Sequence, residues 1–211
     1  MSKSNQPNRC NCAFNPHDSG RRSLLTGAVA LAALAPLTVV SLGAQAQENA
    51  QPAAGGRTSQ KPQPGDHLAF MLGPKQGQQV QPADIVVGAD PTLAYPMDPV
   101  SGKVLIAKAN LITIVRLEPE QLRPASAKNA AAGIVAFSSL CTHYGCPITT
   151  LHPSKTQIVC NCHGSIFDAT NRGAISQGPA TRRLAMLPLE LKDGALVVAG
   201  KFDGPLGPPT S

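Results

Sequence analysis

Two stretches of sequence decide the fold of this chain: CTHYGC at residues 141–146 and CNCHGS at residues 160–165. Each follows a short apolar or β-branched run and each contains a glycine, so we expect two loops at the same end of a sheet. Side chains on two such loops face one another. The loops then bring together four cysteines and two histidines, which is more than one tetrahedral metal accepts.

The spacing within each stretch restricts the backbone. Cys141 and His143 are two residues apart, so they share a face only in an extended chain. Cys160 and Cys162 also share a face if the strand continues. A turn at Gly164 would instead send them to different partners. Both arrangements stay open at this point.

The regions around the two stretches predict one antiparallel all-β domain. Short apolar or β-branched runs recur between turn residues, and 19 glycines and 20 prolines supply many turns. A short helix fits 118–132, limited by Pro119 and Pro124. We expect strands at 67–72, 85–87, 104–107, 111–117, 134–138, 158–160, 184–191 and 195–199.

The first 46 residues have the composition of an export signal. Arg21 and Arg22 precede an apolar run at 24–42, which is followed by the A-x-A pattern at 44–46. Adjacent arginines are typical of the twin-arginine route, so we expect export to the periplasm and cleavage after Ala46. The alternative is a retained anchor in the inner membrane, because the run approaches the ~20 residues that span a bilayer.

Composition divides the rest of the chain. Residues 47–66 are rich in Gln, Pro, Ala and Gly and predict a flexible linker. The domain occupies 67–202, and 203–211, with three prolines and two glycines, predicts a loose tail. Aromatic residues make up 3% of the chain, Trp is absent and the net charge is only +6, which disfavours nucleic-acid binding.

Around these residues the sequence resembles the Rieske family, whose boxes C-T-H-x-G-C and C-x-C-H-G-S it matches residue for residue. The form with an additional cysteine pair resembles the iron-sulfur subunits of cytochrome bc complexes and of arsenite oxidase. The resemblance implies a Rieske-type antiparallel β-sandwich or barrel with a small cluster-binding part at about 139–181. It also implies a 2Fe-2S cluster, with Cys141 and Cys160 on the inner iron and His143 and His163 on the outer iron.

The same resemblance implies a disulfide between Cys146 and Cys162. One alternative is a structural zinc site of two cysteines and two histidines, because zinc accepts the same ligands. Another is a pair of disulfides beside two surface histidines. Iron and acid-labile sulfide in the isolated protein would distinguish the cluster from both alternatives.

Further positions match residues that tune the cluster in this family. Ser165 matches a serine whose hydroxyl bonds a bridging sulfide, and Phe167 stands where high-potential members have Tyr, so a lower potential is expected. Gly178 and Pro179 resemble the start of the loop that covers the cluster. Tyr144 occupies an exposed position where quinol-oxidising members often carry Leu.

Together with the export signal, the resemblance implies an exported one-electron carrier that passes electrons to a c-type cytochrome or similar acceptor. Two histidine ligands leave the oxidised core neutral, which raises the potential into a range of about −150 to +300 mV and couples electron uptake to proton uptake. The alternatives are the iron-sulfur subunit of a quinol–cytochrome c oxidoreductase, beside a cytochrome b, and that of an arsenite-oxidase-like enzyme, beside a molybdopterin subunit. The sequence shows no G-x-S-x-G, P-loop, molybdenum-site or flavin-site motif, so it indicates no independent catalytic site.

Three arginines near the second stretch have two interpretations. Arg172, Arg182 and Arg183 either face an acidic partner or are simply solvated, as most surface arginines are.

Overall fold

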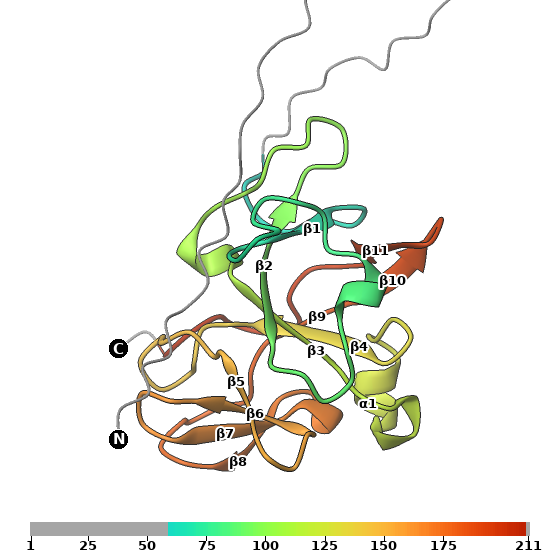
Figure 1. Ribbon diagram of the computed structural model, residues 1–211. Coiled ribbons are helices and arrows are strands. Elements are labelled where there is room, and N and C mark those ends of the chain that lie inside the picture. Colours follow the sequence, from blue (N-terminus) through green and yellow to red (C-terminus); the bar gives the residue numbers. More distant parts are fainter. Residues whose placement is uncertain (1–58, 210–211) are drawn as a thin grey trace, which may run out of the picture. The chain divides into compact units, whose positions relative to one another are not determined.

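A computed structural model describes residues 59–209, and within this range the chain is mostly β-structure (Figure 1). The expected all-β antiparallel class is confirmed. A seven-stranded sheet has the order β10-β11-β1-β2-β3-β4-β9 and a separate four-stranded sheet the order β5-β6-β7-β8. The large sheet comprises β1 His67–Phe70, β2 Thr92–Met97, β3 Ile112–Arg116, β4 Ile134–Ser138, β9 Met186–Leu187, β10 Leu189–Lys192 and β11 Ala195–Val198.

The small sheet is an insertion between two neighbouring strands of the large sheet. The chain leaves β4 at Ser138, forms β5 Thr150–Leu151, β6 Gln157–Cys160, β7 Ser165–Asp168 and β8 Ala174–Gln177, and returns to pair β9 with β4. Figure 1 shows these four strands gathered as a group apart from the large sheet. Both conspicuous sequence stretches lie in this insertion.

Strands β3 and β4 are buried on both faces, which explains their nearly continuous apolar sequences. One face, with Ile112, Ile114, Ile134 and Ala136, packs into the core of the large sheet. Because side chains alternate along a strand, Val115, Val135 and Phe137 point the other way. They join a second core that also contains Cys141 and Cys160. This second core is therefore shared by the insertion and the large sheet.

Helical structure is confined to short segments. The helix expected at 118–132 is reduced to a 3₁₀ turn, Pro119–Gln121, and a single α-turn, α1 Pro124–Ala127, because each proline restarts the backbone at a first-turn position. Other 3₁₀ turns are Pro82–Asp84, Lys108–Asn110 and Ala169–Asn171. Across residues 59–209, no helix reaches the length and apolar character that crossing a bilayer requires.

Several strand predictions need correction. Residues 85–87 and 104–107 are not strands and contribute only isolated bridges, Val87 to Arg116 and Met97 to Val104. The run at 184–191 is divided by Pro188, which lacks the N–H that a continuous ladder would use.

The segments flanking the predicted domain are also more ordered than their composition indicates. In the predicted linker, Pro62 and Asp66 are buried, and the Asn110 side chain donates to the Gln60 carbonyl at 2.6 Å. The start of this linker and the predicted export signal with Arg21 and Arg22 lie outside the described residues. Residues 203–208 of the tail were expected to be loose, but they form hydrogen bonds and ion pairs with arginines of the insertion.

Candidate metal centre

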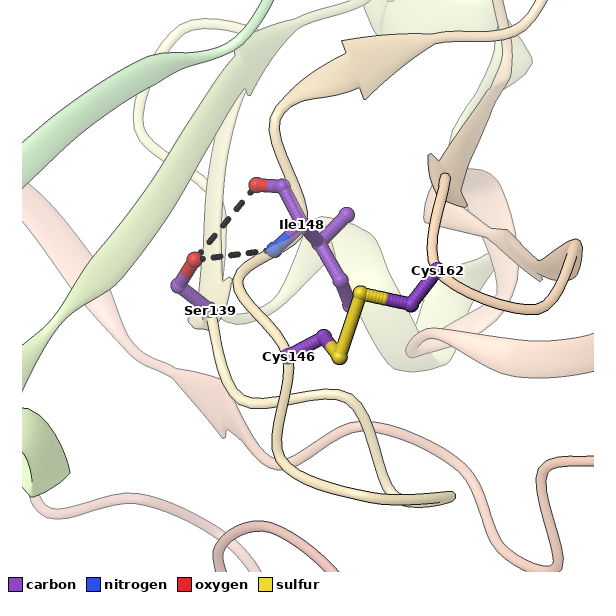
Figure 2. Close-up of a disulfide and its surroundings, with 4 residues drawn as sticks. All are labelled: Ser139, Cys146, Ile148 and Cys162. Carbon is purple, nitrogen blue, oxygen red and sulfur yellow. Dashed lines mark hydrogen bonds between the residues drawn. A yellow bond between two sulfur atoms is a disulfide. The ribbon is translucent and has the colours of Figure 1, made fainter.

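The first ligand loop, residues 140–146, folds back on itself just after β4. The Cys141 N–H donates to the Cys146 carbonyl at 2.9 Å, and the Gly145 N–H donates to the Cys141 carbonyl at 2.8 Å. Gly145 adopts a φ of +73°, which a residue without a β-carbon accepts easily. At the base of the loop, the Ser139 hydroxyl bonds both the N–H and the carbonyl of Ile148 (Figure 2).

The second ligand loop is the tight hairpin between β6 and β7. Cys160 faces Ser165 in the ladder, and the Gly164 N–H donates to the Cys160 carbonyl at 3.0 Å. A disulfide joins this hairpin to the first loop through Cys146 and Cys162, whose Cα atoms lie 6.6 Å apart (Figure 2). The expected disulfide is therefore confirmed, and the turn at Gly164 separates Cys160 from its neighbour two residues on.

The two remaining thiols of the loops, Cys141 and Cys160, are both buried at 1% exposure. Burial raises the pKa of the Cys160 thiol, and the hydrogen-bonded Cys141 side chain raises it further. The backbone N–H groups of Cys162 and His163 act in the opposite direction by donating to the Cys160 sulfur. A bound cation would remove the thiol proton outright, so this pocket favours metal ligation over a free thiolate.

The two histidines lie edge to face, with ring centroids 4.7 Å apart. His163 is exposed. The Nδ1 atom of His143 is buried, and within residues 59–209 it has no hydrogen-bond partner. A buried ring nitrogen left unpaired is costly, and ligation of a metal satisfies it.

A different group of three sulfur atoms, from Cys146, Cys160 and Cys162, lies within 4.8 Å. Two of the three are oxidised in the disulfide and offer no thiolate, so this group alone is a poor site. The donors that fit a metal are the thiols of Cys141 and Cys160 and the imidazoles of His143 and His163. Their assignment as ligands stays a prediction.

The segment after β8 covers the second loop. Gly178 lies so close that a β-carbon there would stand 2.6 Å from the Gly164 carbonyl oxygen and from Ser165 Cα. The Ala180 N–H donates to Ser165 Oγ at 3.1 Å. Ser165 is fully buried, so its own hydroxyl proton remains available for an acceptor inside the site. Pro179 is exposed beside Gly178.

Phe167 and Tyr144 occupy contrasting environments. Phe167 is fully buried in the core that contains Cys141 and Cys160, as expected for a packing residue. Tyr144 is 70% exposed, and its ring centroid lies 4.3 Å from that of His143 and 5.6 Å from that of His163. Tyr144 thus covers part of the histidine face that is open to a partner.

Sequence reasoning missed two groups at this site. The Thr142 hydroxyl, between two predicted ligands, donates to the Arg182 carbonyl at 2.6 Å. Asp203 forms ion pairs with Arg172 and Arg183, whose side chains are still 33% exposed, so both guanidinium groups already have an acidic partner within the protein. The signal available in the sequence was Asp203, an acidic residue in a tail otherwise rich in Pro and Gly.

Comparison with known proteins adds an independent observation. Residues 110–188 match the Rieske [2Fe-2S] domain, a range that includes both ligand loops and the segment that covers them. The chain contains a Rieske [2Fe-2S] domain. This domain implies a 2Fe-2S cluster, and the two thiols and two imidazoles of the site are the donors that such a Rieske centre uses.

The curated proteins that this chain resembles include subunits of respiratory complexes. The cytochrome bc1 complex Rieske iron-sulfur subunit of Streptomyces lividans is 39% identical over 105 residues, 49% of this chain and 61% of that protein. A putative respiratory nitrate reductase subunit Rieske of Haloferax mediterranei is 34% identical over 104 residues, 49% of this chain and 46% of that protein. The chain thus spans less than two thirds of the length of these relatives.

Two solved structures give similar partial matches. The Rieske protein of the cyanobacterial plasma membrane from Synechocystis matches with a TM-score of 0.32 and 25% identity, over 50% of this chain and 84% of that chain. The soluble domain of Rieske protein II from Sulfolobus acidocaldarius matches with a TM-score of 0.37 and 22% identity, over 46% of this chain and 64% of that chain.

Proposed function

We propose that this protein is an exported Rieske electron carrier, which relays single electrons to a c-type cytochrome or a similar acceptor. The observation that carries the proposal is the donor set: two buried thiols and two imidazoles on loops joined by a disulfide. When bound to these residues, a 2Fe-2S cluster accepts and releases one electron.

The residues around the site divide into an inner and an outer side. Cys141 and Cys160 lie in the apolar core, where water is excluded. His163 and Tyr144 are exposed, so a partner reaches the site most closely at the histidine side. The imidazoles also offer ring N–H groups there, which is why we propose that electron uptake is coupled to proton uptake.

Two alternatives concern the complex in which the protein works. The names of the curated relatives favour a subunit of a cytochrome bc1-type complex, where quinol would be the donor. The second alternative is an arsenite-oxidase-like enzyme with a molybdopterin subunit as donor. It is kept because the exposed Tyr144 stands where quinol-oxidising members often carry Leu. From Arg21 and Arg22 we also propose export by the twin-arginine route, with the periplasm as the destination. The protein contacts the inner membrane only if the N-terminal segment is retained.

The first experiment tests the cluster in protein isolated from the cell envelope. We expect iron and acid-labile sulfide in equal amounts, and an electron paramagnetic resonance signal after reduction. His163→Ala should abolish the signal, whereas His152→Ala, a histidine of the β5–β6 turn outside the site, should keep it. Colourless protein with stoichiometric zinc would overturn the proposal.

The second experiment identifies the partners. Co-purification followed by mass spectrometry distinguishes a cytochrome b partner from a molybdopterin subunit. Stopped-flow mixing of the reduced protein with a c-type cytochrome should show rapid reoxidation.

Voltammetry tests the proton coupling, since the potential should fall with rising pH under alkaline conditions. A potential that stays constant across the alkaline range would contradict coupling at the histidines.

A further inference from the structure

The chain runs back from the large sheet to the ligand loops after Phe202, which packs against the core of the large sheet. We call residues 203–208 the C-terminal brace. Its first residue is fixed to β9 by one backbone hydrogen bond and one side-chain hydrogen bond. The Asp203 N–H donates to the Met186 carbonyl at 2.9 Å, and the Met186 N–H donates to Asp203 Oδ1 at 2.7 Å.

Asp203 anchors the brace to the insertion by charge. Arg172, which follows β7, donates through Nε and Nη2 to Asp203 Oδ2 at 3.2 and 2.5 Å. Arg183 donates through Nη1 to Asp203 Oδ1 at 2.9 Å. Burial alone would raise the pKa of Asp203, but these arginines and the Met186 N–H together hold it below its ordinary value. Two segments of the insertion thus converge on one carboxylate.

Arg182 joins the last three residues of the brace to the first ligand loop. Its Nη2 atom donates to the carbonyls of Leu206, Gly207 and Pro208 at 3.3, 2.6 and 3.2 Å. The backbone carbonyl of the same arginine accepts the hydrogen bond of the Thr142 hydroxyl at 2.6 Å. One residue therefore holds the brace on one side and the loop between two predicted ligands on the other.

The brace also packs directly on the loop. A β-carbon at Gly207 would lie 3.7 Å from the Leu140 side chain, and one at Gly145 would lie 3.4 Å from Pro208 Cδ. Leu140 immediately precedes the ligand Cys141, and Gly145 follows His143 by two residues. Both ends of the loop are in contact with the same short segment.

We propose that the C-terminal brace positions the first ligand loop, and that Arg182 is the positioning residue through which it acts on His143. Among the described residues, the loop is also held by its own hydrogen bonds between Cys141, Gly145 and Cys146, by Ser139 at its base and by the disulfide. Contacts from the brace limit the opening of the loop and the access of water to that side of the site. The effect on the cluster rests on the proposed function, whereas the effect on the loop does not.

The test compares three variants of the full chain. One ends after Asp203 and so keeps the anchoring carboxylate but lacks the remaining brace. The second is Arg182→Ala. The third, Arg182→Lys, serves as a conservative rescue, because an ammonium group also offers three donors to the carbonyls. Amide hydrogen exchange of Cys141 and Gly145 reports loop opening, and voltammetry and the rate of cluster loss to a chelator report the site.

We expect loop exchange to be at least about fivefold faster in the truncated and Ala variants, because loss of these contacts lowers the free energy of local opening. Cluster loss should accelerate and the potential should shift in the same two variants. Arg182→Lys should stay near the unmodified protein, and a far-sheet control, Glu190→Gln, should be unchanged. Unchanged loop exchange in both the truncated and Ala variants would overturn the proposal.

The design separates failure of this inference from failure of the proposed function. If the isolated protein contains no cluster, the measurements of iron and sulfide show that, and loop exchange still tests the brace. If the cluster is present and loop exchange accelerates, but neither the potential nor the rate of cluster loss changes, the brace has no role at the metal site and the inference is overturned.

Discussion

Replacing Ser165 with Ala tests how the buried hydroxyl contributes to the site. Ser165 is fully buried, and its Oγ accepts the Ala180 N–H at 3.1 Å. The hydroxyl therefore acts as an acceptor toward the covering segment and keeps one proton to donate into the site. The substitution removes both interactions and adds no bulk, so the two effects can be measured separately.

The expected magnitudes follow from the value of one hydrogen bond. The lost bond from Ala180 is worth about 0.5–1.5 kcal/mol, which for a domain of this size lowers the melting temperature by about 1 to 6 °C. A donated bond that favours the reduced state by the same amount raises the potential of a one-electron centre. Its loss therefore lowers the midpoint potential by about 20 to 65 mV.

The assay uses the holoprotein of both variants. Protein-film voltammetry gives the potential, and circular dichroism gives the melting temperature. The matched control is Ser176→Ala, since the hydroxyl of Ser176 accepts a hydrogen bond from Gln157 at 2.9 Å on the exposed strand β8. This control should leave the potential unchanged.

An unchanged potential in Ser165→Ala, with full iron content and a lowered melting temperature, would refute the donation into the site. It would leave Ser165 with a structural role only. An unchanged melting temperature would refute the importance of the Ala180 bond.

Three further predictions address other parts of the site. Phe167→Tyr should raise the potential in voltammetry, because it adds a hydroxyl in the core that contains the predicted ligands Cys141 and Cys160, and an unchanged value would remove this tuning role. Replacing Cys146 and Cys162 together by Ser opens a loop with a sequence separation of 16 and should lower the free energy of unfolding in urea by about 3 kcal/mol, and equal midpoints would contradict this. Because the folded-state pKa of Asp203 lies below its ordinary value, its stabilisation is complete above about pH 4 and is lost as the pH falls through the folded pKa. Asp203→Asn should accordingly destabilise the protein at neutral pH by an amount that shrinks in acid, and a pH-independent difference in urea titrations would contradict the ion-pair account.

The sequence predicted those parts of the fold in which local pattern and burial agree. The strand at 134–138 was expected with the bounds it has, because its β-branched and aromatic residues are buried on both faces. The cysteine and histidine pattern predicted two facing loops, and the family resemblance implied the disulfide that joins them. Strands with polar or interrupted sequences were missed.

Strand β2, Thr92–Met97, is absent from the expected strands and has an interrupted sequence. It contains Pro96, and proline within a run argues against a central strand. In the structure, β2 pairs with β3 only over Thr92–Ala94. The Pro96 carbonyl accepts the Leu105 N–H, so the missing N–H faces that side and the ladder with β1 is intact. The register that makes this proline harmless is a tertiary property.

The C-terminal brace could not be predicted for a similar reason. Its sequence DGPLGP has no periodic run of apolar side chains that would predict packing. Its order comes instead from carbonyl oxygens that meet Arg182 and from one carboxylate that meets two arginines. Such long-range polar contacts leave no periodic pattern in a sequence.

The arrangement of edge strands in the large sheet has a consequence for self-association. Its two outermost strands, β9 and β10, are separated in the chain by Pro188 alone, and the Leu189 N–H is already bonded to the Asn129 carbonyl. The two edges of this sheet thus lie close together and offer few unpaired backbone groups to a strand from another molecule. Strand β8, the outer strand of the small sheet, is largely exposed. Strand addition would therefore be expected at β8, which pairs with β7 in the sheet that carries the second ligand loop.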